Sequence, residues 1–360
     1  MPDPPLPQPS PQQLLPKFYR WSDAISPLVL LRCIQPAFSL TILLLACAAY
    51  WGTFAVHDLL DHYLAASQAA APLEGPSSWL SLDPPPQNSP AVNLQWLNSQ
   101  AFGRAVRYSL SPAATLAWSV DNPQVWNALL KQLIIYLLWL VPIGLVLRAS
   151  ITSCAERRDT SLKACLRLLR SRAVAMVSVL LIPLLAVLFA AAAYWLIGFL
   201  ARLAPVIADV LMLVCVPFLI AAGVLAVGSL FAVPLAWASL LTETDCDPFD
   251  ALSRGYEYTL RRLIPLAIYV LAAWGIHWVA FRLVEAICIG GWNIAERLVR
   301  MSADGQELPG ISEAFVLHLP DVFSVVLFWS LVGGIYLLLR RDANDQEIED
   351  IQENLLPSSR

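Results

Sequence analysis

The chain has 360 residues, of which 58% are hydrophobic and 14% are charged, and its mean hydropathy is +0.62. Ordinary soluble domains carry about 45–50% apolar and about 25% charged residues, so a soluble core of this size could not bury so much apolar surface. The formal net charge of -4 argues against nucleic acid as a partner, because phosphate binding needs a basic face.

The N-terminal region is proline-rich, and we expect an extended leader followed by an interfacial helix within residues 1–35. The first apolar run begins only at Pro36. It is too long for the apolar region of a typical cleavable signal peptide, so we expect it to remain as the first membrane span.

Six stretches are apolar enough and long enough to cross roughly 30 Å of hydrocarbon at about 1.5 Å per residue. We therefore expect an all-α polytopic transmembrane helical bundle with amphipathic juxtamembrane helices. The expected spans are residues 36–56, 126–147, 173–200, 218–241, 263–281 and 319–339. Residues 206–241 could instead hold two short spans, but Pro217 divides them unevenly, so we place an outer segment before it and one span after it.

The basic residues of the connections predict that both termini lie on the cytoplasmic side, where Lys and Arg are retained. In that orientation the inner segments hold most of the Lys and Arg residues, and a seventh span would reduce this asymmetry. The remaining expected segments are an outer loop 57–125, a basic inner loop 148–172, an outer segment 201–217, an inner loop 242–262, an outer segment 282–318 and an acidic cytoplasmic tail 340–360.

The seven cysteines, at positions 33, 47, 154, 165, 215, 246 and 288, include no Cys-x-x-Cys pair and no histidine at zinc-ligand spacing. In the expected topology only Cys288 lies clearly on the outer side, where it has no obvious partner. We therefore expect no disulfide framework.

A polar segment follows the first span and contains His57, Asp58, Asp61 and His62. If it is helical, each histidine lies four residues from an aspartate, and such pairs can bind a divalent metal or hold a proton-bearing imidazole. The alternative is a polar helix end that emerges into water. We favour the alternative and assign neither metal nor cofactor, because no recognised ligand motif is present.

Lys131 and Asp209 are the charged residues nearest to true membrane depth, and charges at that depth often mark transport pathways. Both lie near the outer ends of their segments. There Lys131 can extend to the interface and Asp209 can remain hydrated, so a transporter or channel is the second hypothesis rather than the first.

The first inner loop concentrates basic residues among leucines, in the pattern of a basic amphipathic helix. We expect this helix to lie on an anionic inner leaflet, each basic residue contributing about 1 kcal/mol at low salt. The residues concerned are Arg157, Arg158, Lys163, Arg167, Arg170 and Arg172. The acidic tail carries the opposite charge: it could dock on this loop, recruit a soluble protein partner or remain solvated.

Several stretches together resemble a family of uncharacterised polytopic inner-membrane proteins of planctomycete-type bacteria. They are residues 156–164 (ERRDTSLKA), 182–185 (IPLL), the loop 242–258 with DPFDALSR, and 335–342 (IYLLLRRD). The likeness runs from about the second span to the C-terminus, whereas the leader and the first outer loop do not match clearly. It implies a bacterial inner-membrane location and a six-span plan. That family has no established activity, so no functional residue is carried over.

No Gly-x-Ser-x-Gly, phosphate-binding glycine loop or His-Glu-x-x-His occurs, so nothing argues for an enzyme. We expect a non-catalytic membrane component or interaction scaffold that makes its contacts through the inner loops and the acidic tail. The alternatives are a small-solute transporter or channel and, third, a metal-dependent enzyme at the outer face.

Overall fold

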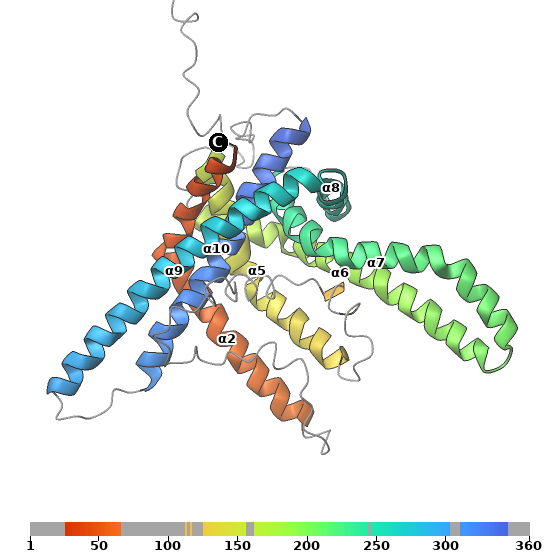
Figure 1. Ribbon diagram of the computed structural model, residues 1–360, viewed down its shortest axis with the longest axis horizontal. Coiled ribbons are helices and arrows are strands. Elements are labelled where there is room, and N and C mark those ends of the chain that lie inside the picture. Colours follow the sequence, from red (N-terminus) through yellow and green to blue (C-terminus); the bar gives the residue numbers. More distant parts are fainter. Residues whose placement is uncertain are drawn as a thin grey trace, which may run out of the picture.

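The computed structural model describes residues 26–65, 112, 113, 116, 125–155, 162–243, 246–302 and 310–344. Within these residues the chain is all-α, as the sequence predicts (Figure 1). Its elements are η2 (Ser26–Phe38), α2 (Leu40–Ala65), α5 (Val125–Ala155), α6 (Leu162–Ala201), α7 (Pro205–Thr242), α8 (Pro248–Arg261), α9 (Leu263–Ser302) and α10 (Gly310–Asn344).

Five helices, in α5, α6, α7, α9 and α10, are long and apolar enough to cross a membrane. The 3₁₀ helix η2 and the helix α2 make a sixth span if they count as one element, bent by 70° at the break between them. Pro36 lies inside η2 and lacks the N–H that a continuous helix needs, which accounts for a break in this region. The chain is therefore a multi-pass membrane protein, and each of the six expected spans falls within one of these elements.

Helix α10 lies at the centre of the bundle and packs against α9, α5, η2, α2 and α7. In its most apolar stretch 94% of the residues are buried. Two adjacent glycines let neighbours approach closely: a Cβ on Gly334 would lie 2.5 Å from the Cys33 sulfur, and one on Gly333 would lie 3.0 Å from the Ser150 hydroxyl. Small residues of this kind set the contacts between membrane helices, because lipid is as apolar as leucine.

Helices α6 and α7 form a long hairpin that extends away from the rest of the bundle (Figure 1, green). The connection between them is only residues 202–204, so the outer segment predicted at 201–217 is not a separate element. Pro205 occupies the first turn of α7, where a missing N–H costs nothing, and α7 continues through Pro217 as one helix. Residues 206–241 therefore do not form two spans.

Helix α8 is an amphipathic helix that crosses the end of α7. The side chain of Asp247 caps its start by accepting a hydrogen bond from the Asp250 amide at 2.8 Å. Gly255 then faces the backbone of α7, because a Cβ there would lie 2.3 Å from the carbonyl oxygen of Ala232. The next residue, Tyr256, donates its hydroxyl to the Leu225 carbonyl at 2.6 Å, so α8 is fixed against α7 at two points.

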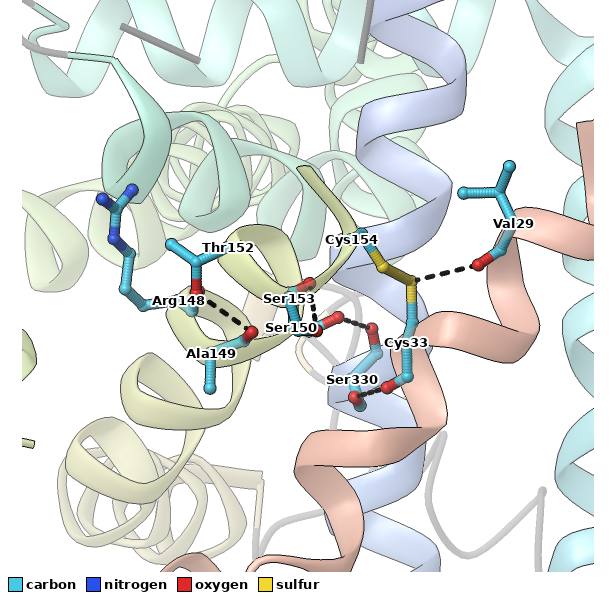
Figure 2. The surroundings of a disulfide bond; sticks show 9 residues. All are labelled: Val29, Cys33, Arg148, Ala149, Ser150, Thr152, Ser153, Cys154 and Ser330. Atoms are coloured by element: carbon cyan, nitrogen blue, oxygen red, sulfur yellow. Dashed lines mark hydrogen bonds between the residues drawn. A yellow bond between two sulfur atoms is a disulfide. The ribbon is translucent and has the colours of Figure 1, made fainter. Parts of the chain in front are cut away.

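A disulfide joins Cys33 of η2 to Cys154 near the end of α5 (Figure 2). The prediction of no disulfide is wrong for this pair, because η2 folds back against α5 and α10 instead of leaving the bundle as a leader. Hydrogen bonds extend the link to α10: Ser330 donates to the carbonyl of Cys33, and Ser150 donates to the carbonyl of Ser330 at 2.5 Å. The non-α backbone of η2 is thus satisfied by protein, as membrane depth requires.

Candidate functional site at the α8 end of the bundle

One end of the bundle gathers charged and polar side chains from several helices. It is the end where α5, α7 and α10 finish and where α6, α8 and α9 begin, and we call it the α8 end (Figure 1, top). The distribution of basic residues assigns this end to the cytoplasm. The site has two parts, an interior cluster around Glu243 and an exposed basic face on α6.

Glu243, directly after α7, connects three helices. Its amide bonds back to the Ser239 carbonyl at 3.0 Å, which ends the helix. Its carboxylate pairs with Arg254 of α8 and accepts a hydrogen bond from the Tyr336 hydroxyl of α10 at 3.1 Å. A carboxylate is unfavourable beside the negative end of a helix dipole, so these two donors are what make Glu243 acceptable at this position.

Two arginines from neighbouring helices cover the end of α7. Arg148 of α5 donates to the Leu241 carbonyl at 2.9 Å, and Arg172 of α6 donates to the carbonyls of Cys246 at 2.7 Å and Glu243 at 3.3 Å. The last carbonyls of a helix have no partner within it, and α7 has no basic residue in its own last turn. The arginines therefore supply both the hydrogen bonds and the positive charge that this helix end lacks.

Arg172 therefore differs from the other basic residues predicted to face lipid. It is half-buried and turned toward the α7–α8 connection. Its role in the fold is to hold that connection, and we remove it from the expected lipid-binding set.

Burial raises the pKa of the Cys246 thiol in the α7–α8 connection, so the sulfur stays protonated at neutral pH and is a poor nucleophile. Burial likewise raises the pKa of the Tyr256 and Tyr258 phenols on α8. These groups act as neutral hydrogen-bonding and packing residues, and the interior cluster works as a structural joint.

The α6 basic face consists of Lys163, Arg167 and Arg170, with Leu162 and Leu166 beside them. The three basic residues recur at i, i+4 and i+7, which places them on one side of the helix, and all three are exposed. The two leucines are 42% and 41% exposed.

The opposite side of the same turns is buried. Leu169 is 3% exposed and packs so closely on α5 that a Cβ on Gly144 would lie 2.2 Å from it. The helix therefore has only one orientation in which it can meet a partner, with its basic side outward. Arg157 and Arg158, the other two predicted members, lie outside the described residues.

The two charges considered for transport are not brought together. Lys131 lies in the second turn of α5, whereas Asp209 is exposed in the second turn of α7, next to the hairpin connection. Figure 1 shows these two helix starts far apart.

The four residues considered for metal binding, His57, Asp58, Asp61 and His62, have side chains outside the described set. Across the side chains that the structure does describe, no group of three His, Cys, Asp or Glu residues could hold a metal ion.

Two further histidines serve contacts between helices. His277 of α9 is fully buried, with Nε2 at 3.0 Å from the Ser324 carbonyl and 3.1 Å from its hydroxyl on α10. His318 of α10 lies near the Tyr50 hydroxyl of α2 at 3.4 Å and near Asp321 at 3.7 Å. Polar side chains thus mark helix contacts here as the small residues do.

Sequence reasoning missed the interior cluster. Glu243, Arg254 and Tyr336 are far apart in the sequence and fit no motif. The one available signal was a single acidic residue at the end of a long apolar helix, which needs a cation nearby.

No protein-family model, no curated protein and no solved structure matches this chain.

Proposed function

We propose that this chain is a non-catalytic scaffold of a bacterial inner membrane, which binds anionic lipid and a protein partner at its α8 end. The α6 basic face carries the proposal. Lys163, Arg167 and Arg170 point away from the bundle on a helix that continues directly into a membrane span. A basic face held at the start of a span lies at the depth of the lipid headgroups.

The interior cluster supports the same proposal by making this end rigid. Glu243, Arg254 and Tyr336 join α7, α8 and α10, while Arg172 joins α6 to the same connection. A surface whose supporting side chains are already paired loses little conformational freedom on binding, which favours a docking role. The cytoplasmic placement rests on the retention of basic residues on that side.

The lipid part is tested on the purified full-length chain in mild detergent, titrated with phosphatidylglycerol or phosphatidylcholine at low salt. Three exposed basic residues contribute together about 3 kcal/mol, so K163Q/R167Q/R170Q should weaken phosphatidylglycerol binding about 100-fold. The matched control, R202Q/R297Q/R300Q, removes the same charge from the hairpin connection and the far end of α9. Equal losses in the two variants, or no preference for the anionic lipid, would contradict the proposal.

The partner part is tested by chemical cross-linking in intact cells followed by purification in mild detergent. A protein recovered with the wild-type chain and lost with K163Q/R167Q/R170Q, but retained with the control variant, is the expected result. Recovery of the chain alone would argue strongly against the scaffold.

The transporter hypothesis rests on Lys131 and Asp209, and no geometric observation supports it, because the two residues lie on separate helix ends. The broken span η2–α2 is of a kind that lines cavities in transporters. Here, however, the backbone of η2 is bonded to α10 through Ser330. We therefore keep the scaffold as the proposal.

A further inference from the structure

We propose that the acidic tail of this chain, residues 345–353, docks on the α6 basic face and competes there with anionic lipid. The inference rests on the proposed function, because it concerns the same face. It adds a regulated state: the face is covered by the tail when the surrounding lipid is neutral and is released when the lipid is anionic.

The first argument is that the face is open. Within the part of the chain that the structure describes, Lys163, Arg167 and Arg170 form no ion pair and no side-chain hydrogen bond. Their neighbours Leu162 and Leu166 also remain exposed, so the face offers apolar surface beside its charge. An occupant should therefore carry negative charge and a few apolar side chains.

The second argument is that the tail has this composition. Residues 345–353 hold five carboxylates, namely Asp345, Glu347, Glu349, Asp350 and Glu353, and no basic residue. Ile348 and Ile351 lie among them, with Leu355 shortly after, at a spacing that puts all three on one side of a helix. The tail thus complements the α6 basic face in charge and in apolar content, and the same charge would repel it from anionic lipid.

The third argument is reach. Helix α7 packs against both α10 and α6, and packed helix axes lie about 8–10 Å apart, so the axes of α10 and α6 are within about 20 Å near Glu243. Both helices run from Glu243 toward the α8 end, α10 to its last residue, Asn344, and α6 back to its first, Leu162. Nine extended residues span about 30 Å, so the acidic stretch can lie along the basic face without any movement of the helices.

The tail is also held at the correct end. Tyr269 of α9 donates to the carboxylate of Asp342 at 2.6 Å, which fixes the last turn of α10. A short tether of this kind keeps a ligand at millimolar effective concentration. If the tail covers the face for about nine-tenths of the time, the apparent affinity for lipid falls about tenfold.

Contact is tested on the full-length chain in a neutral detergent at low salt, with a carbodiimide. The reagent joins the Lys163 amine to a carboxylate as an amide with loss of water, and mass spectrometry locates the bond. We expect cross-links from Lys163 to residues 345–353, which R167Q/R170Q weakens and which phosphatidylglycerol or 0.5 M NaCl removes, because salt screens exposed charges. Cross-links that survive salt, or none from Lys163 to the tail, would overturn the proposal.

An isotope mixture distinguishes the chain's own tail from that of a second copy. Labelled and unlabelled protein are mixed before cross-linking, and only cross-links within one isotope are expected. Mixed pairs would show that the tail reaches a neighbouring molecule, which contradicts docking within the chain.

Competition is tested by lipid affinity. The variant D345N/E347Q/E349Q/D350N/E353Q keeps the length of the tail and should bind phosphatidylglycerol about tenfold more tightly than wild type. The control E296Q/E313Q removes acidic charge at the opposite end and should change nothing. Equal affinity of the tail variant and wild type would overturn competition.

The outcomes separate the two proposals. If wild-type protein prefers phosphatidylglycerol but shows no cross-link to the tail, the proposed function stands and the docking fails. If the cross-link forms but no anionic lipid binds to either the wild type or the tail variant, the docking stands and the lipid part of the proposed function fails.

Discussion

Helices α7 and α10 are similar in length and apolar character, yet they occupy opposite positions in the molecule. Their most apolar stretches have hydropathies of 2.8 and 2.3, but 6% of that stretch is buried in α7 and 94% in α10. The more hydrophobic helix is therefore the less buried one. In water this order would be surprising, but in lipid apolarity drives insertion and adds nothing to contact between helices.

The difference lies in small and polar side chains. The buried side of α10 carries Ser324, Ser330, Gly333 and Gly334, which meet His277, Cys33 and Ser150 on three other elements. The same helix α7 is buried from Gly228 onward, where α8 approaches, whereas a Cβ on Gly223 would meet nothing within 4 Å. Burial in this protein therefore follows close backbone approach and interhelical hydrogen bonds.

The sharpest test of this comparison substitutes one glycine in each helix. Gly334→Leu should destabilise the protein by about 3 kcal/mol or more, since the new side chain would overlap Cys33 and Leu30. Gly223→Leu should stay within about 0.5 kcal/mol, because the site is open. Thermal denaturation in detergent, followed by size-exclusion chromatography, measures both; similar losses would break the comparison.

The second test concerns the disulfide beside Gly334. Replacing Cys33 and Cys154 together by serine should lower the unfolding free energy by about 2 kcal/mol, because η2 is then tied to α5 only by non-covalent contacts. Cys215→Ser on α7 should have little effect. Both bridge sulfurs are nearly inaccessible, at 0% and 3% exposure for their residues, so a mild reductant should act only after the protein is partly unfolded. Alkylation with mass spectrometry checks this accessibility.

The third test separates two arginines of α6 that lie two residues apart. Arg172→Ala should cost about 1–2 kcal/mol of stability, because the end of α7 loses hydrogen bonds from a charged donor. Arg170→Ala should leave stability unchanged and weaken phosphatidylglycerol binding about fivefold, since the residue is exposed. Stability and lipid affinity are measured on both variants, and a reversed pattern would contradict the assignment of Arg172 to the interior.

The smallest expected effect is at the boundary between the exposed and buried parts of α7. Tyr256→Phe removes the hydroxyl that donates to the Leu225 carbonyl but keeps the ring against Gly228. The loss should be about 0.5–1 kcal/mol, the net contribution of one neutral hydrogen bond. Gly228→Val, by contrast, should cost more because it displaces the ring, and the two melting temperatures together show whether packing or hydrogen bonding fixes α8.

Much of the candidate site could not be predicted, for a reason visible in its residues. The spacing of Lys163, Arg167 and Arg170 already places them on one side of a helix, since helical periodicity is local. Arg172 belongs to the same basic run, and only the position of the α7–α8 connection turns it inward. Glu243, Arg254 and Tyr336 meet across three helices, and no local pattern specifies such contacts.

The sequence by itself determined that the chain is all-α and crosses a membrane several times, because the length and apolarity of each segment are sufficient for that outcome. Only the tertiary structure decided that α10 is central, that the α6–α7 hairpin is peripheral and that Cys33 meets Cys154. These features depend on how closely two backbones approach and on which side chains pair between distant segments, and hydropathy carries no information about either.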